Sequence, residues 1–195
     1  MNMPNRLTLS RIILAPVFVI VFLLDSHYCR ISGFIIFILA SITDFADGHY
    51  ARKYGIVTGF GKFMDPLADK ILVTSAFLVI LSLDYARTWM IALIVAREFY
   101  ITGLRSLAAY RGAIITPSNM AKLKTTLQMT TIIFILLIIS LDSFFTLNPS
   151  PVQAYLQFDR HLVFDIMIGI TTAVTIYTGL DYTIKYYSIL RNILK

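Results

Sequence analysis

The sequence ILVTSAFLVILSL, residues 71–83, contains no charged side chain and is almost entirely apolar. Runs of the same kind recur along the chain, near residues 7–24, 31–50, 63–83, 87–109, 120–141 and 161–184. Each is close to the roughly 20 residues that a helix needs to cross the hydrocarbon core of a bilayer. Their apolar residues are continuous and do not alternate, which disfavours a membrane β-barrel. We therefore expect an all-α membrane protein with six transmembrane helices.

The composition favours the same class. Of 195 residues, 57% are hydrophobic and 14% are charged, whereas about a quarter of a soluble domain is charged; the mean hydropathy is +0.75. The length suits a single domain over residues 1–195. One cysteine and three scattered histidines predict neither a disulfide nor a zinc site. The net charge of +6 comes without a basic stripe interleaved with aromatics, so it favours an anionic membrane surface over nucleic acid as a partner.

Lysine and arginine are distributed unequally between the two sides of such a bundle. With six spans, one side has both termini and the 51–62 and 105–124 connections, and its basic residues are Arg6, Arg11, Arg52, Lys53, Lys62, Arg105, Arg111, Lys122, Lys124, Lys185, Arg191 and Lys195. The other side has only Arg30, Arg87 and Arg160. The positive-inside rule makes the first side cytoplasmic. We expect a bacterial-type cytoplasmic (inner) membrane protein with both termini in the cytoplasm.

The stretch TDFADGHYARKYGIVTGFGKFMDPLADK, residues 43–70, places four aspartates directly before the opening run. Asp44 and Asp47 are three residues apart, so on a helix their carboxylates lie on one face. Asp65 precedes a proline, which is typical of a helix N-cap followed by the first helical residue. Asp69 lies one turn further, on the same face as Asp65. We expect two helix ends that present two carboxylates each to a cavity at the cytoplasmic mouth of the bundle.

Such a cluster needs compensation, because an ionised aspartate within a bilayer costs about 3 kcal/mol and neighbouring carboxylates repel one another. Divalent cations supply it, and oxygen ligands favour Mg²⁺ or Mn²⁺. The alternative is that the aspartates cap helices and pair with nearby lysines and arginines. Four carboxylates at helical spacing beside Gly48 and Gly61 favour the metal site, because glycine lets a ligand approach the backbone. Two such ions beside Arg52 are suited to binding and cleaving a pyrophosphate.

The same stretch fits the pattern D-x-x-D-G-x-x-A-R, eight residues, G-x-x-x-D-x-x-x-D at every fixed position. This pattern resembles the signature of the CDP-alcohol phosphotransferases, six-helix membrane enzymes that are usually homodimers. The resemblance implies that Asp44, Asp47 and Asp65 ligate a pair of Mg²⁺ or Mn²⁺ ions, and that Asp69 completes the site and is the catalytic general base. It further implies that the CDP part of CDP-diacylglycerol is bound by Gly48, Ala51, Arg52 and Gly61.

The N-terminal sequence PNRLTLSR also resembles this family, which implies that Asn5 and Thr8 border the nucleotide. A helix start with Thr8 as a local cap is an equally good interpretation.

The acceptor alcohol has to be inferred from other residues. A phosphorylated acceptor brings about two negative charges and needs its own cations; the candidates are Arg97, Arg105, Lys122 and Lys124. Arg97 lies inside an apolar span, where an unpaired arginine is costly. Its structural alternative is a pair with Glu98, but sequence neighbours point to different helix faces. Arg105 follows two turns later on the same face, whereas the two lysines could equally be anchors on the positive side.

These segments, R-E with a later L-R and K-x-K-T, resemble the branch of the family that uses glycerol 3-phosphate. The resemblance implies transfer of a phosphatidyl group from CDP-diacylglycerol to glycerol 3-phosphate, with release of CMP, by a homodimer in the bilayer. A cardiolipin-type acceptor, inositol phosphate or serine is the alternative within the family. A divalent-cation transporter would also place acids in helices, but it needs a polar path across the bilayer, and runs such as VFVIVFLL, residues 17–24, offer almost none.

Overall fold

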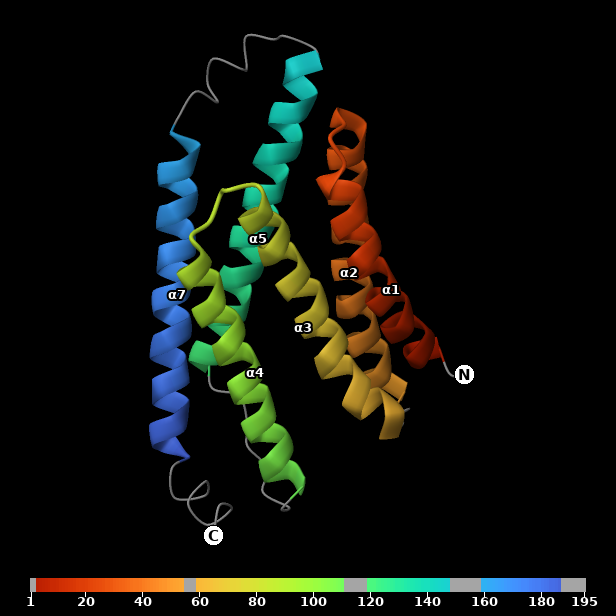
Figure 1. Cartoon of the computed structure of the whole chain (residues 1–195). Coiled ribbons are helices and arrows are strands. Elements are labelled where there is room, and N and C mark those ends of the chain that lie inside the picture. Colours follow the sequence, from red (N-terminus) through yellow and green to blue (C-terminus); the bar gives the residue numbers. More distant parts are fainter. Residues whose placement is uncertain (1–2, 55–58, 111–118, 148–158, 187–195) are drawn as a thin grey trace. The chain divides into compact units, whose positions relative to one another are not determined.

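The computed structural model is helical in almost all of the residues that it describes, which are 3–54, 59–110, 119–147 and 159–186 (Figure 1). Side chains are described for residues 9–43, 67–109, 120–145 and 159–186. The described residues form no strand, and their helices are α1 (Met3–Leu23), α2 (His27–Tyr54), α3 (Gly59–Ser82), α4 (Thr88–Tyr110), α5 (Asn119–Leu147) and α7 (Arg160–Lys185). The all-α prediction is therefore confirmed, with one helix for each predicted span.

Several helices extend beyond the apolar runs that predicted them. Helix α2 covers residues 27–54 instead of 31–50, and α5 continues to Leu147. A formed helix gains one hydrogen bond for each added residue, so it continues into polar sequence. Helix α3 begins at Gly59, six residues before Asp65. The prediction that Asp65 caps this helix is therefore wrong, and the proline after it lies in the helix interior, as membrane helices tolerate.

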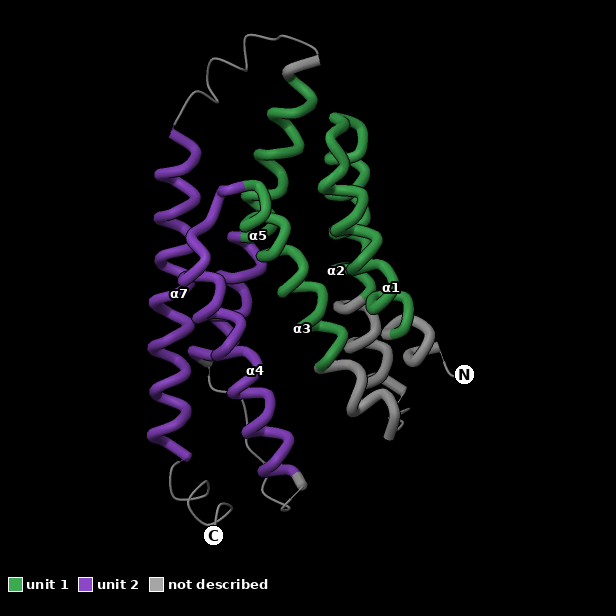
Figure 2. Tube along the Cα trace, in the orientation of Figure 1, with its two compact units in different colours: residues 1–83, 132–158 green, residues 84–131, 159–195 purple. Residues whose placement is uncertain are grey.

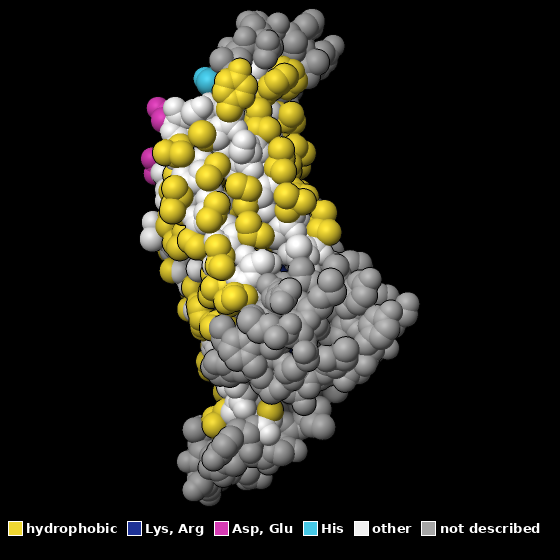
Figure 3. Space-filling view, turned by 90° about the vertical axis from the view of Figure 1, so that its right-hand side faces the viewer, with side chains coloured by type: hydrophobic (Ala, Val, Ile, Leu, Met, Phe, Trp, Pro, Cys, Tyr) yellow, Lys and Arg dark blue, Asp and Glu magenta, His cyan; other side chains and the backbone are white. Residues whose placement is uncertain are grey.

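Two helices of the described part are long and apolar enough to cross a membrane, over Met120–Phe145 and Arg160–Lys185. The segments Leu9–Leu23 and His27–Thr43 are also apolar but shorter. Large apolar side chains are exposed in the middle of helices, and on the face shown in Figure 3 they cover much of the described surface. Examples are Ile13, Ile20, Ile35, Leu39, Ile166, Ile170 and Leu180. A lipid environment would cover these side chains, which agrees with a membrane-associated protein.

The chain divides into two compact units (Figure 2). Unit 1 comprises residues 1–83 and 132–158, and unit 2 comprises residues 84–131 and 159–195. The boundary falls inside α5, whose N-terminal half belongs to unit 2 and whose C-terminal half belongs to unit 1.

In unit 1, α1 packs against both α2 and α3. The ring of Phe18 lies 5.7 Å from that of Phe22 and 5.2 Å from that of Phe37, measured between centroids. Gly33 of α2 allows this helix to lie close to Phe22 of α1, because a Cβ atom added at Gly33 would lie only 2.9 Å from the Cβ of Phe22. Small residues permit such close approach of membrane helices, and Ala15 in α1 is likewise fully buried.

The C-terminal half of α5 is attached to the beginning of α2 by polar contacts. His27 Nδ1 and Ser143 Oγ form a hydrogen bond of 2.8 Å. Ser140 donates to the backbone carbonyl of Arg30 at 3.3 Å. These contacts lie at the opposite end of α2 from its two aspartates.

In unit 2, α4 packs against α7. At the N-terminal ends of both helices, the ring of Tyr85 stacks on His161 at 5.1 Å and contacts Phe164 edge-on at 5.3 Å. Arg87 Nε donates to Asp165 Oδ2 at 3.0 Å. The start of α4 is thereby fixed against the start of α7.

Candidate functional site

The aspartate signature lies on the facing ends of two consecutive helices of unit 1. Asp44 and Asp47 belong to α2, and Asp65 and Asp69 belong to α3. Only residues 55–58 connect these helices, which also contact each other. The backbone is helical at all four positions, which was predicted for Asp44, Asp47 and Asp69 but not for Asp65.

Most residues predicted to bind the metal ions or the CDP moiety lie outside the residues whose side chains are described. They are Asn5, Thr8, Asp44, Asp47, Gly48, Ala51, Arg52, Gly61 and Asp65. Among the described side chains, no three metal-ligating groups gather in one place. Three of the four predicted metal ligands, Asp44, Asp47 and Asp65, lie outside the described side chains.

Asp69 is the one signature residue whose side chain is described. Its side chain is 39% exposed, and Oδ2 lies 3.5 Å from Lys70 Nζ. Contacts of this kind between partly exposed groups contribute at most about 1 kcal/mol. The neighbouring Ala68 and Leu72 are buried, so Asp69 lies at the edge of the packed face of α3. Its carboxylate is accessible, and its oxygen atoms fit a hard divalent ion or a hydroxyl donor.

Arg11 is buried, although the sequence predicts it only as one of the charges on the cytoplasmic side. It is 1% exposed. It shares a face of α1 with Ala15, Phe18 and Phe22, all of which are fully buried. The spacing of these four residues was the available signal. A buried guanidinium therefore lies on the helix that contacts both α2 and α3.

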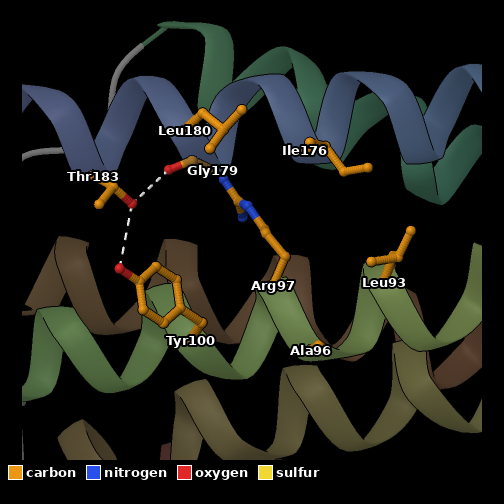
Figure 4. Close-up of a pocket in the computed structure, with 8 residues that line it drawn as sticks. All are labelled: Leu93, Ala96, Arg97, Tyr100, Ile176, Gly179, Leu180 and Thr183. Carbon is orange, nitrogen blue, oxygen red and sulfur yellow. Dashed lines mark hydrogen bonds between the residues drawn. The ribbon is translucent and has the colours of Figure 1, made fainter.

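In unit 2, Arg97 of α4 reaches across to α7. Its Nη2 donates to Thr178 Oγ1 at 3.1 Å, and its Nε is buried without a hydrogen-bond partner in the structure as described. Figure 4 shows the side chain directed at Gly179. A Cβ atom at Gly179 would lie 3.1 Å from Arg97 Cγ. Glycine at this position therefore makes room for the arginine.

Arg97 and Glu98 form the pair that was the structural alternative to a role in phosphate binding. Arg97 Nη1 lies 3.3 Å from Glu98 Oε1. Both side chains are long enough to turn toward each other from different faces of the helix, so the pair forms although the two residues are neighbours in sequence. Glu98 also accepts a hydrogen bond from Lys124 Nζ of α5. Glu98 and Lys124 are 5% and 2% exposed, so one carboxylate contacts both the buried Lys124 and Arg97, whose side chain is 12% exposed.

The remaining two predicted acceptor residues are more open. Arg105 is half-buried, and its Nε donates to Tyr182 Oη of α7 at 2.7 Å. Arg97 and Arg105 therefore both reach α7, as their two-turn spacing predicted. Lys122 is exposed, whereas Lys124, two residues later on the same helix, is buried. The structure thus divides the four cations into an accessible pair, Arg105 and Lys122, and a pair engaged by Glu98.

A stripe of buried hydroxyls on α7 was not predicted. Thr171, Thr175, Thr178 and Tyr182 follow one another at helical spacing and are at most 3% exposed. Thr171 Oγ1 lies 3.0 Å from Thr131 Oγ1 of α5. Thr171 and Thr178 also donate to carbonyl groups of α7 four residues earlier, at 2.9 and 2.8 Å. The mean hydropathy of the segment does not reveal such a stripe, because threonine is only weakly polar.

Beside this stripe, a groove of about 410 Å³ runs between α4 and α7 (Figure 4). Its lining is mostly apolar, and the stem of Arg97 forms part of it. Thr183 donates to Tyr100 Oη at 3.4 Å across one end. The groove exposes the aliphatic part of Arg97, while the guanidinium is directed to the buried side of α7.

The charges of the two units differ in a way that suggests different tasks. Unit 2 has ten lysines and arginines against five acids, whereas unit 1 has seven against six. The four signature aspartates all belong to unit 1. The predicted metal ligands therefore belong to unit 1, and the predicted acceptor-binding cations belong to unit 2.

Comparison with known proteins agrees with this chemistry. The profile of the CDP-alcohol phosphatidyltransferase family matches residues 1–177. A CDP-diacylglycerol–glycerol-3-phosphate 3-phosphatidyltransferase of Rickettsia typhi is 41% identical over 181 residues, which cover 93% of this chain and 94% of the relative. Proteins of the same name from Bacillus subtilis and Salmonella typhimurium are 42% and 39% identical over 148 and 141 residues, covering 70% and 69% of this chain and 77% and 76% of those relatives. This chain therefore belongs to the CDP-alcohol phosphatidyltransferase family.

Proposed function

We propose that this protein transfers the phosphatidyl group of CDP-diacylglycerol to glycerol 3-phosphate, giving phosphatidylglycerophosphate and CMP. The names of relatives that align over most of the chain support this reaction. The observation within the structure that favours a phosphorylated acceptor is the basic cluster of unit 2. Arg97 and Lys124 both contact the carboxylate of Glu98, so among the described side chains two cations lie beside one carboxylate. A dianionic acceptor phosphate would be attracted to such a group of cations.

The aspartates would perform the chemistry. Asp44, Asp47, Asp65 and Asp69 provide oxygen ligands for Mg²⁺ or Mn²⁺, which we propose as a pair. Such ions, when bound, neutralise charge on the pyrophosphate. Asp69 takes the proton of an acceptor hydroxyl, whose oxygen attacks the phosphorus that bears the diacylglycerol. The bond from this phosphorus to the bridging oxygen breaks, and CMP leaves.

Substrate binding would use the other predicted residues. We assign the CDP moiety to Asn5, Thr8, Gly48, Ala51, Arg52 and Gly61. The phosphate of the acceptor would contact Arg105 and Lys122, the two cations that remain accessible. Arg97 and Lys124 would add positive charge from their buried positions. An acceptor without a phosphate gives this cluster less charge to bind, since serine brings a single carboxylate and a phosphate brings about two negative charges.

We further propose that all six helices span a bacterial inner membrane, with both termini and the site on the cytoplasmic side. The structure buries Arg11 and Lys124, so neither marks a surface, but the other ten basic residues on that side still outnumber the three opposite. Cys29 provides the test, because it lies in the first turn of α2 and is partly exposed. A membrane-impermeant maleimide should label Cys29 in intact cells. A Cys29→Ser, Lys122→Cys variant should be labelled only after permeabilisation.

The family resemblance also leads us to propose a homodimer, which the mass of the protein in detergent would test.

The transporter remains the alternative from another class, and the stripe of buried hydroxyls on α7 argues against it. Toward the N-terminus of α7, the stripe gives way to Ile168 and Phe164, both fully buried. The hydroxyls thus extend over only part of the helix, where a transport path would need polar groups along all of it.

The decisive experiment measures CMP release by purified protein in detergent with CDP-diacylglycerol and Mg²⁺ or Mn²⁺. Glycerol 3-phosphate, glycerol, serine and inositol phosphate are supplied in turn. We expect release only with glycerol 3-phosphate, and its loss in Asp69→Asn. Asp84→Asn is the matched control, because Asp84 is an exposed residue at φ 60°, a conformation that asparagine tolerates. Release with another acceptor would reassign the basic cluster, and no release with any acceptor in folded protein would refute the proposed reaction.

A further inference from the structure

We infer that Tyr182 is a positioning residue that orients Arg105 for the phosphate of the acceptor and so contributes to selecting a phosphorylated substrate. This inference rests on the proposed function. Tyr182 belongs to none of the sequence motifs described above. It lies near the end of α7, in unit 2 with Arg105.

The contact between the two side chains is specific. Arg105 Nε donates to Tyr182 Oη at 2.7 Å, and the guanidinium carbon lies 5.0 Å from the centre of the Tyr182 ring. Tyr182 is 3% exposed, and its ring lies 4.8 Å from that of Tyr186. A buried tyrosine hydroxyl normally has a hydrogen-bond partner, and here this partner is the arginine. The position of the phenol oxygen is thus fixed by packing, and it fixes Arg105 in turn.

The use of Nε determines how Arg105 can bind an anion. A guanidinium can contact a phosphate through Nε and one Nη, or end-on through both Nη atoms. With Nε occupied by Tyr182, the end-on mode remains. The structure gives the two Nη atoms of Arg105 no hydrogen-bond partner among the described residues. The donors suited to a phosphate are therefore the ones left available.

The chemical nature of the partner matters as well. A carboxylate at Nε would offset the positive charge of Arg105, as Glu98 does in part for Arg97 and Lys124. Tyrosine is uncharged near neutral pH, so it orients the guanidinium without reducing its charge. Unit 2 thus contains arginines held in two ways: Arg97 by a carboxylate and a hydroxyl, and Arg105 by a phenol alone. The second arrangement suits binding of a dianionic phosphate that comes and goes in each turnover.

The test is Tyr182→Phe, which removes one oxygen atom and keeps the ring. In the CMP-release assay, we expect KM for glycerol 3-phosphate to rise about tenfold, because hydrogen bonds to charged groups have that order of effect. The value of kcat and the KM for CDP-diacylglycerol should change by less than about twofold. Tyr177→Phe is the matched control, since Tyr177 is on the same helix but 60% exposed, and all of its constants should match the wild type.

A second variant separates positioning from packing. Arg105→Lys has no Nε–H to orient, so adding Tyr182→Phe to it should raise KM no further. The inference is overturned if Tyr182→Phe leaves KM for glycerol 3-phosphate unchanged, if it raises KM equally in the Arg105→Lys background, or if it unfolds the protein while Tyr177→Phe does not. Failure of the proposed function itself would look different, because the wild type would then show no CMP release that depends on glycerol 3-phosphate.

Discussion

Replacing Glu98 by glutamine removes the carboxylate that Arg97 and Lys124 both contact, and it keeps the size of the side chain. Glu98 and Lys124 are 5% and 2% exposed, and the side chain of Arg97 is 12% exposed. Glutamine can accept a hydrogen bond from one of the two cations, but it no longer offsets their positive charge. Breaking a buried ion pair by removing one partner costs about 3–5 kcal/mol.

A loss of this size is easily measured. For a chain of this length, each kcal/mol lowers the melting temperature by about 2–4 °C, so Glu98→Gln should melt on the order of 6–20 °C lower. Circular dichroism of the helical signal in detergent is a suitable assay. The double variant Glu98→Gln, Lys124→Met removes one cation as well and should recover more than half of the loss. Arg87→Gln is the control, because its pair with Asp165 is largely exposed on the arginine side and contributes less than about 1 kcal/mol.

Two results would refute this reasoning. If Glu98→Gln melts within the range of the Arg87→Gln control, the carboxylate does not compensate buried charge. If the double variant melts at the same temperature as Glu98→Gln, then the uncompensated charge of Lys124 is not what lowers the stability of the single variant.

Three further predictions follow from the packing and from the proposed metal site. Gly33→Ala should lower the melting temperature, because the new methyl would lie 2.9 Å from Phe22, while Gly103→Ala, which meets nothing within 4 Å, should raise it slightly. Gly179→Ala should displace Arg97, whose Cγ lies 3.1 Å from the added Cβ. We expect the variant to raise KM for glycerol 3-phosphate, and a KM equal to that of the wild type would contradict this. Chelation by EDTA should abolish CMP release and added Mg²⁺ or Mn²⁺ should restore it, whereas full activity in EDTA would exclude the metal site.

The helices could be predicted because lipid allows few alternatives. A continuous apolar run must satisfy its backbone internally, which makes it a helix, and all six runs became helices. Helix ends were harder, since they depend on propagation into polar sequence, and Asp65 was therefore misread as a cap. Asp44, Asp47 and Asp69 were correctly predicted to lie in helices, because helix formation there follows from the local apolar pattern.

The contacts of unit 2 could not be predicted from spacing alone. Whether Glu98 turns toward Arg97, Lys124 or both depends on the position of α5, which no local pattern encodes. The same holds for Tyr182, whose role becomes visible only once α7 lies beside α4. Arg105 illustrates the difference: its face was predictable from the two-turn spacing to Arg97, but its partner was not.

The internal hydrogen bonds of α7 also bear on how the protein is made. Thr171, Thr172, Thr178 and Thr183 each donate to the carbonyl group four residues earlier in the same helix. These four hydroxyls are therefore satisfied within α7 alone, whereas Thr175 Oγ1 has no hydrogen-bond partner in the structure as described. Thr171 and Thr178 need no contact with Thr131 or Arg97 to satisfy their donors. Most threonine hydroxyls of α7 can thus be satisfied before the helix packs against α4 and α5.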